Sequence, residues 1–425
     1  MARTVTIPVA APPDTLRVDV AFYDEDEQAA FEKVLPSDIL KDIPGEMVIP
    51  TPDFCTYYLY YKLREGVRGY GSHNEVADKW QFALGELDGQ IEFADGTIRL
   101  THAEGTNRGT SERFGEAIGL SVASQLHNIH GGDWNRIPET NTRKIFDFNG
   151  LIASDGQQFV QLEAKGSSVE DNQRKPSTVS NHKRSIKAKK SEATPAERTE
   201  SVLYGTIGVI DDRPVSTARC WLVDPPADAF GDPQRFRLLS RLEYIAHYIS
   251  YLGQRSQLAA ALQTRLAALH AAKEYTDLDG IALRTGNDEE FTTETFDQAG
   301  KHNPWFGSKS VVTDGPAGGH VYAANDEVLL FIGIREQLVA YAAPQDFDQI
   351  LKYTFPAGVM EKTVQCVVSR ARFKRDFALY VGLQREEIEA SAGYFRFLLS
   401  GHLYYCQSGL VFGVLPIPEA WRTTS

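Results

Sequence analysis

Residues 143–165 have the sequence RKIFDFNGLIASDGQQFVQLEAK, which predicts a β-hairpin. The runs at 143–153 and 157–165 are short and rich in apolar residues, and turn residues separate them, so both are typical of strands. Between them lies Ser154-Asp155-Gly156. A three-residue hairpin loop needs a left-handed residue at its end, and Gly156 can adopt that conformation without steric cost.

The length of this loop fixes which residues of the two strands face each other. With three loop residues, Ala153 pairs with Gln157, and counting back places Asp147 opposite Glu163. Directly opposed residues share a face of the sheet, with Cβ atoms about 4.5–5.5 Å apart. Lys165 is two residues beyond Glu163 and therefore joins them on that face. The alternate residues of the second strand are expected to face a core: Val160, Leu162 and Ala164.

Two carboxylates this close repel each other, and a bound cation would remove the conflict. Hard oxygen ligands favour Mg²⁺ or Mn²⁺, with water and substrate phosphate completing the coordination shell. The neighbouring Lys165 can orient a water molecule, so the group is suited to cutting a phosphodiester. The alternative is an exposed, charged strand pair, because a Glu-x-Lys triplet is expected about once by chance in a chain of this length.

The segment before the hairpin predicts a helix from about residue 110 to residue 127. Thr110 or Ser111 is a suitable N-cap. Apolar residues recur at helical spacing, namely Phe114, Ile118, Leu120, Val122 and Leu126. Glu112 and Glu116 are four residues apart and lie on one face of this helix. The simplest role for such residues is to complement the helix dipole, and this is our interpretation of Glu112.

Residues 108–225 resemble the PD-(D/E)XK, or restriction-endonuclease-like, nuclease superfamily. The positions that match its pattern are Glu116 on the first helix, Asp147 on the second strand, and Glu163 and Lys165 on the third. The phrase at 163–166, Glu-Ala-Lys-Gly, is similar to that of the Mrr-like restriction branch. The proline that gives the superfamily its name is absent before Asp147, where Ile145-Phe146 stand.

The resemblance implies a fold and a reaction. The expected fold class is α/β (α+β overall), with a restriction-endonuclease-like αβββαβ core and a mixed sheet, flanked by N-terminal and C-terminal accessory regions. The implied activity is that of a Mg²⁺-dependent endonuclease that hydrolyses phosphodiester bonds, in bacterial restriction or anti-phage defence. The implied metal ligands are Glu116, Asp147 and Glu163, with Lys165 orienting the attacking water. Gln161 and Gly166 would support the site.

A basic block follows the hairpin. The chain as a whole is acidic, with 57 Asp and Glu against 44 Lys and Arg and a net charge of −13. Residues 171–190 reverse this balance with seven basic residues: Arg174, Lys175, Lys183, Arg184, Lys187, Lys189 and Lys190. Lys183, Lys187 and Lys190 form one helical stripe, and together with Arg184 they are predicted to contact nucleic-acid phosphates. The alternative is a solvated, mobile loop.

The length of 425 residues predicts two or three domains. Strands at 201–210 and 217–223 would complete the nuclease sheet, and Asp224-Pro225-Pro226 would end the unit. The expected regions are therefore an N-terminal accessory region at 1–105, a nuclease core at 106–228, and a C-terminal helical and β region at 229–425. In the last region, 328–334 and 337–341 look like strands around an Arg-Glu turn.

The remaining sequence features concern location and partners. The sequence has no apolar run near 18–20 residues and no signal peptide, so no membrane association is expected. Four scattered cysteines without metal-ligand spacing indicate reduced core residues in a cytoplasmic protein. The helices expected from residue 232 to about residue 273 are compatible with a helical hairpin or a homodimer surface, and an ATPase or helicase partner subunit is a further open alternative.

Two other functions stay open at this point. One is a non-catalytic nucleic-acid-binding or assembly subunit that retains the nuclease fold. A protein that has lost catalytic activity does not need two opposed carboxylates, which repel each other, so the sequence favours an enzyme. The other keeps the catalysis but replaces DNA with RNA as the substrate. Nothing in the sequence selects a target sequence or a strand preference.

Overall fold

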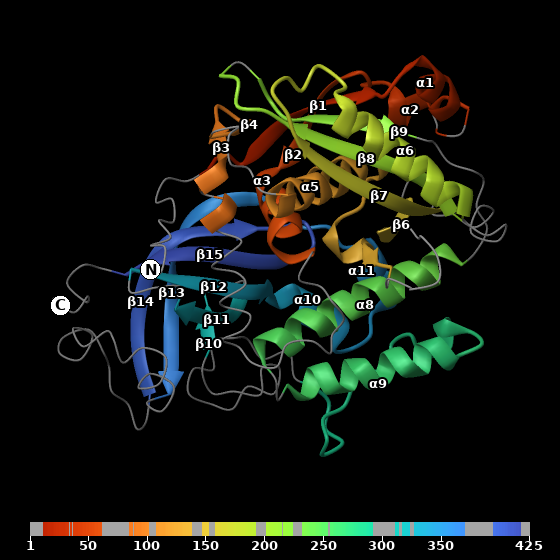
Figure 1. Cartoon of the computed structure of the whole chain (residues 1–425). Helices are drawn as coiled ribbons and strands as arrows, with labels where there is room; N and C mark the ends of the chain where they lie inside the picture. The colour runs from red at the N-terminus through yellow and green to blue at the C-terminus, as the bar shows by residue number, and fades with distance from the viewer. Residues whose placement is uncertain are drawn as a thin grey trace. The chain divides into compact units, whose positions relative to one another are not determined.

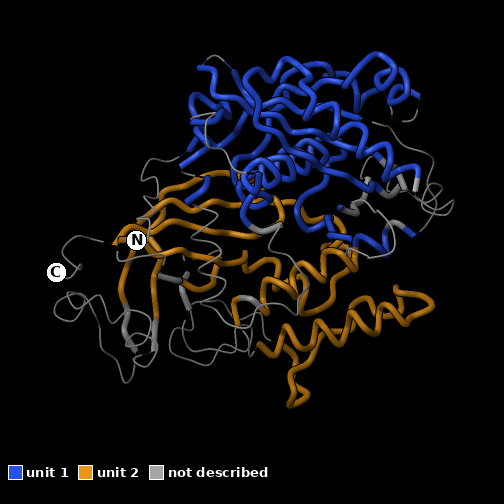
Figure 2. Tube along the Cα trace, in the orientation of Figure 1, with its two compact units in different colours: residues 1–8, 12–68, 82–237 blue, residues 9–11, 69–81, 238–425 orange. Residues whose placement is uncertain are grey.

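The computed structural model describes residues 12–33, 35, 37–61, 85–87, 89–101, 108–137, 147–152, 158–192, 201–214, 216–223, 232–253, 256–291, 311–313, 317–323, 327–369 and 394–417. The chain is a mixed α/β protein with a mixed sheet (Figure 1). It forms two compact units, one made of residues 1–8, 12–68 and 82–237 and the other of residues 9–11, 69–81 and 238–425 (Figure 2).

A seven-stranded sheet organises the first unit. Its order is β2-β1-β9-β8-β7-β6-β5. The strands are β1 (Thr15–Phe22), β2 (Gly45–Pro50), β5 (Asn135–Arg136), β6 (Phe148–Ile152), β7 (Gln158–Ser168), β8 (Ser201–Ile210) and β9 (Arg219–Val223). β7 and β8 run parallel, as do β1 and β9, whereas the other neighbours are antiparallel.

The described helices of this unit are interspersed with its strands. They are α1 (Glu25–Phe31), α2 (Ser37–Leu40), α3 (Thr51–Thr56) with a π-helical continuation η1 (Tyr57–Tyr61), α5 (Arg108–His127), the short η2 (Gly131–Asp133) and α6 (Ser177–Glu192). A small hairpin, β3 (Ile91–Ala94) and β4 (Thr97–Leu100), lies between η1 and α5 in the sequence. Among the described elements from α5 to β8, the order is helix, short 3-10 helix, three strands, helix and strand.

The N-terminal segment belongs to this same sheet. β1 pairs with β9 in the register Asp19↔Arg219 to Phe22↔Leu222, and β2 pairs with the other edge of β1. Residues expected to form an accessory region at 1–105 therefore supply two strands to the sheet that contains β6 and β7. The first unit includes the whole of the segment 106–228 together with these strands.

Close backbone contact fixes α5 against the sheet. A Cβ atom on Gly166 of β7 would overlap the carbonyl oxygen of Ser111 and lie 2.8 Å from the backbone nitrogen of Gly115, both on α5. A Cβ on Gly119 would lie 3.1 Å from the Cβ of Ala164. Only glycine permits this approach. α5 therefore packs on the face of β7 that carries Ala164 and Gly166.

α6 packs on the opposite face of the sheet. Its Val179 and Ile186 belong to a buried cluster with Ile207 and Val209 of β8. Gly205 of β8 makes room for Ile186, since a Cβ at this glycine would lie 2.6 Å from the Ile186 side chain. Successive residues of a strand point to opposite faces. Glu163 pairs with Gly205 and Lys165 pairs with Ile207, and paired residues share a face of the sheet. Glu163 and Lys165 therefore both face α6.

His127, at the end of α5, makes the first unit sensitive to acid. Its buried side chain shares a hydrogen bond of 3.0 Å with the Tyr204 hydroxyl of β8. Burial lowers the pKa of His127 from 6.5 to about 3. Below pH 6.5 the unfolded chain therefore binds a proton that the folded protein does not. The stability contributed by the neutral imidazole is complete above pH 6.5 and is lost as the pH falls toward 3.

We expect His127→Gln to reduce this acid sensitivity. Between pH 6.5 and pH 5, protonation of His127 in the unfolded state should lower the wild-type free energy of unfolding by about 2 kcal/mol. The variant lacks this loss, and urea unfolding at the two pH values measures the difference. His270→Gln, which changes an exposed histidine of the second unit, is the matched control. Equal losses in His127→Gln and the wild type would contradict this account.

The second unit combines helices with a closed β-barrel. Its elements are α8 (Pro233–Leu252), which begins in the first unit, α9 (Gln257–Ala271), η3 (Tyr275–Leu278), β10 (Val311–Thr313), β11 (Ala317–Ala323), β12 (Val328–Arg335), α10 (Glu336–Ala342), α11 (Phe347–Lys352), β13 (Gly358–Ser369), β14 (Tyr394–Tyr405) and β15 (Leu410–Pro416). The barrel order is β10-β11-β12-β15-β14-β13. Apolar side chains such as Phe331, Phe397 and Leu403 pack together in a buried cluster.

Two sequence expectations for this unit have different outcomes. Residues 328–334 lie in β12, as predicted, whereas the strand predicted at 337–341 was wrong, because these residues lie in α10. No helix in the described ranges is both long enough and apolar enough to cross a membrane.

Candidate active site

The hairpin has the register that the sequence predicts. The pairs run from Phe148↔Leu162 to Ile152↔Gln158, which is the alignment that a loop with Ala153 opposite Gln157 requires. The loop itself, with Ser154-Asp155-Gly156, lies outside the described residues. Asp147 directly precedes β6, and its backbone N–H donates to the carbonyl oxygen of Leu162 at 3.2 Å. Asp147 is thereby fixed beside the end of the strand pair.

Asp147, Glu163 and Lys165 come together on the α6 face of the sheet. The Lys165 Nζ lies 3.6 Å from Asp147 Oδ2 and also forms an ion pair with Glu163 Oε1. Glu163 is completely buried, while the side chains of Asp147 and Lys165 stay about one-fifth exposed. The carboxylate pair is therefore buried at Glu163 and open to solvent at Asp147.

A second lysine completes the cluster, and our sequence interpretation did not place it there. Lys189 of α6 has its Nζ 2.7 Å from Glu163 Oε2 and 3.4 Å from Asp147 Oδ1. The sequence signal is helical spacing, since Lys189 follows the buried Ile186 by three residues and therefore lies on the same inward face of α6. In the stripe that we selected instead, Lys183 and Lys190 lie three and four residues from Ile186, so spacing alone did not single out Lys189.

Burial and mutual repulsion determine the electrostatics of the site. Burial, followed by the negative charge of Asp147, raises the pKa of Glu163 to about 7, although Lys165 and Lys189 act in the opposite direction. Burial acts to lower the pKa of Lys165, but the charges of Asp147, Glu163 and then Glu116 outweigh it and raise that pKa above its ordinary value. Lys165 is therefore a hydrogen-bond donor and not a base.

Glu116 approaches the cluster from α5 on the other face of the sheet. It is mostly buried, and its Oε1 lies 3.8 Å from Arg136 Nη2 of β5. Its negative charge contributes to the raised pKa of Lys165. The close contact between Gly115 and Gly166 explains this position, because it brings the backbone next to Glu116 against the backbone next to Lys165. Glu116 thus lies beside Arg136 and within electrostatic range of Lys165.

The two residues expected to support the site occupy opposite faces of β7. Gln161 alternates with Glu163 and Lys165, is half-buried, and shares their face. Gly166 faces α5, where its missing side chain leaves room for the Ser111 carbonyl group. Gly166 supports the site indirectly, by fixing the helix that carries Glu116.

Two residues of the expected phosphate-binding stripe contact carboxylates instead. The Nζ atoms of Lys183 and Lys187 each lie 2.9 Å from Glu27 Oε1 of α1, and Lys183 also pairs with Asp24 at 2.5 Å. Lys183 and Lys187 therefore connect α6 to the region around α1. The other two members of the predicted set behave differently: Arg184 is exposed and its side chain bonds that of Asn181, while Lys190 is half-buried.

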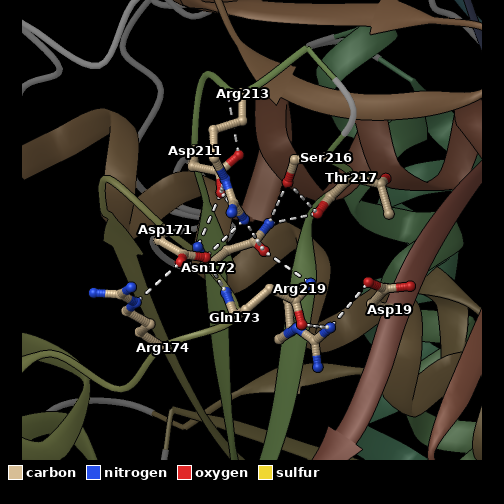
Figure 3. Close-up of polar contacts among 10 residues, drawn as sticks. All are labelled: Asp19, Asp171, Asn172, Gln173, Arg174, Asp211, Arg213, Ser216, Thr217 and Arg219. Carbon is tan, nitrogen blue, oxygen red and sulfur yellow. Dashed lines mark hydrogen bonds and ion pairs between the residues drawn. The ribbon is translucent and has the colours of Figure 1, made fainter.

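A buried polar cluster anchors the start of the segment that leads into α6 (Figure 3). The Asn172 N–H donates to Asp211 Oδ2 at 2.9 Å, and Asn172 Nδ2 donates to Ser216 Oγ at 2.9 Å. Arg213 Nη2 lies 2.8 Å from both Asp211 Oδ2 and Asp171 Oδ1. Asn172 and Asp211 are buried. The cluster joins the β7–α6 connection to the β8–β9 connection and so fixes where α6 begins.

The donor set at Asp147 and Glu163 fits a hard divalent cation. Mg²⁺ is usually held by one or two carboxylates, with water and substrate phosphate filling the remaining positions. Both carboxylates already face cationic groups, namely the ammonium groups of Lys165 and Lys189, so the geometry places positive charge between them. Within the described ranges, no group of three or more His, Cys, Asp or Glu side chains is placed to hold a metal ion.

Comparison of the chain with protein-family models, with curated proteins and with solved structures returned no match. Function is therefore inferred from the chemistry of the site itself.

Proposed function

We propose that this protein is a Mg²⁺-dependent endonuclease that hydrolyses phosphodiester bonds, with DNA as the preferred substrate. The strongest support is the carboxylate pair formed by Asp147, directly before β6, and Glu163 in β7. Lys165 and Lys189 contact both of these carboxylates. Buried carboxylates in such proximity are unfavourable without a cationic partner. The order α5-β5-β6-β7-α6-β8 supports a place in the PD-(D/E)XK superfamily.

Each residue of the site has a separate role in this reaction. Asp147 and Glu163 would hold Mg²⁺, or Mn²⁺ in its place, with water and a substrate phosphate. The bound ion would polarise the phosphoryl oxygen and stabilise the leaving oxygen. Lys165 donates hydrogen bonds, which orient the attacking water and offset negative charge on the phosphoryl group. Glu116 pairs with Arg136, and its negative charge adds to the larger effects of Asp147 and Glu163 that raise the pKa of Lys165.

The biological setting is proposed by analogy with the fold alone: restriction or anti-phage defence in a bacterial cytoplasm, with a homodimer or an ATPase or helicase subunit as partner. The four cysteines are free and buried, in keeping with a reducing compartment.

Cleavage assays test this function directly. Supercoiled plasmid, linear duplex, single-stranded DNA and RNA are incubated with the protein and Mg²⁺, Mn²⁺ or EDTA. We expect cleavage of DNA with either metal and none with EDTA. Lys165→Ala should reduce the rate about 100-fold or more, because it removes a preorganised donor from the transition state. Lys41→Ala, at an exposed lysine of the same unit, is the matched control.

Each other outcome favours a specific alternative. Cleavage of RNA alone would change the substrate and keep the site. Binding of DNA without cleavage, in every metal, would favour the non-catalytic nucleic-acid-binding or assembly subunit. Metal-dependent cleavage that Lys165→Ala leaves unchanged would overturn the assignment of the site.

A further inference from the structure

We propose that Lys189 competes with the divalent cation for Asp147 and Glu163, so that cation binding releases the Lys189 ammonium group toward the substrate phosphate. This role rests on the proposed function, because it assigns a further residue to the same site. It differs from the role of Lys165, which lies on the same strand as Glu163 and stays beside the carboxylates.

The two lysines together contact every oxygen atom of the carboxylate pair. Lys189 lies 2.7 Å from Glu163 Oε2 and 3.4 Å from Asp147 Oδ1. Lys165 contacts the other two oxygens, Glu163 Oε1 and Asp147 Oδ2. A cation that binds both carboxylates must therefore replace at least one of the two lysine ammonium groups at the carboxylate oxygens.

The two lysines differ in their surroundings, and this difference makes Lys189 the one that we expect the cation to displace. Lys165 is attracted by three carboxylates, those of Asp147, Glu163 and Glu116. Among the described residues, Lys189 forms ion pairs with Asp147 and Glu163. Lys189 lies three residues from the end of α6, and its flexible four-carbon stem allows the ammonium group to move without the helix.

The backbone of α6 is well anchored, so the movement is confined to the side chain. Lys183 and Lys187 bind Glu27, which holds the middle of the helix. The cluster around Asn172 fixes the connection that leads into α6 (Figure 3). Lys189 would therefore leave the carboxylates by rotation about its own bonds and remain tethered near the site.

The exchange changes the charge of the site in the direction that a nucleic acid requires. With Glu163 ionised, the two carboxylates and the two ammonium groups sum to zero. A divalent cation adds two positive charges, and the tethered Lys189 keeps its own charge nearby. The site thus becomes attractive for a phosphodiester only after the cation has bound, which couples substrate binding to cation binding.

Measurement of Mn²⁺ binding tests the competition without reference to activity. The free Mn²⁺ signal in electron paramagnetic resonance gives the affinity of the wild-type protein and of Lys189→Met, Lys189→Gln and Lys189→Arg. We expect the Met and Gln variants to bind Mn²⁺ about tenfold more tightly, because the carboxylates no longer spend most of their time bound to an ammonium group. Lys189→Arg should resemble the wild type, as should the exposed control Lys41→Met.

Amine labelling of the wild-type protein gives an independent readout that needs no variant to fold. Reductive methylation, quantified by mass spectrometry, should proceed faster at Lys189 when Mn²⁺ is present and at an unchanged rate at Lys41. Unchanged or weaker Mn²⁺ affinity in the Met and Gln variants, or unchanged labelling of Lys189, would overturn the competition even if the wild type binds Mn²⁺ and cleaves DNA. Absence of Mn²⁺ binding in every form would overturn the proposed cation site as well.

Discussion

Glu163→Gln is expected to lower the rate of metal-dependent cleavage by about 10²–10³-fold while the protein stays folded. Glutamine has nearly the same size and shape as glutamate, so it fits the same buried position. It lacks the negative charge that the proposed cation needs, and one of its two terminal atoms is a donor rather than an acceptor. The loss should appear in kcat, measured with plasmid DNA and saturating Mg²⁺.

The matched control for this variant is Glu170→Gln. Glu170 is exposed, lies two residues beyond the end of the same strand and carries an acidic side chain of the same type. Its replacement should leave kcat unchanged, which separates the role of Glu163 from the overall charge of the unit. Full activity in Glu163→Gln would contradict the proposed nuclease site, whereas equal losses in both variants would point to a general charge effect.

Gly166→Ala is expected to lower the free energy of unfolding of the first unit by at least about 3 kcal/mol. The added methyl group would overlap the Ser111 carbonyl oxygen and press against the backbone of Gly115. Both obstacles are backbone atoms of α5, so relief requires a shift of the whole helix. A shift of α5 would also move Glu116 away from Lys165. The variant should therefore lose stability, as measured by urea denaturation, and cleavage activity together.

Gly89→Ala provides the comparison for this loss. Gly89 belongs to the same unit, and a Cβ at this position would have no heavy atom within 4 Å beyond its own neighbours along the chain. This substitution should change the free energy of unfolding by no more than about 0.5 kcal/mol. A small effect of Gly166→Ala, similar to that of Gly89→Ala, would show that α5 and β7 are not in the tight contact described above.

Local patterns in the sequence were sufficient to predict the hairpin. A three-residue turn and alternating apolar residues together define a register, and a slip of one residue would turn Glu163 from the α6 face to the α5 face of the sheet. The same pattern predicted that Val160, Leu162 and Ala164 face a core, and in the structure all three are buried on the α5 face. Lys165 followed automatically from its position two residues beyond Glu163.

Contacts between distant segments were not predictable in this way. The basic block contains seven lysines and arginines, and helical spacing alone did not show which of them faces the sheet. Lys189 forms an ion pair with Glu163 because α6 packs on the face of the sheet that carries Glu163. Lys183 and Lys187 instead form ion pairs with Glu27, about 160 positions away in the chain. The carboxylates of α1 carry no sequence signal that connects them to α6.

The error at 337–341 has a simpler cause. The run Gln337-Leu338-Val339-Ala340-Tyr341 is short and apolar, and a segment of this length fits the period of a helix and of a strand equally well. In the structure, Leu338, Val339 and Ala342 are the buried residues of α10, which is a helical spacing. Ala342 lies one position beyond the run and four residues after Leu338, so including it would have distinguished a helix from a strand.

The parallel pairing of β1 with β9 also constrains how the protein is made. Asp19 and Arg219, which lie opposite each other and are joined by a hydrogen bond, are separated by 200 positions in the chain. At translation rates of about 5–20 residues per second, β1 would wait about 10–40 s after its synthesis for its partner. During this interval one edge of β1 lacks its strand partner, and such edges promote association between chains. Folding yield in the cell should therefore depend on what protects this first strand while the ribosome completes the sheet.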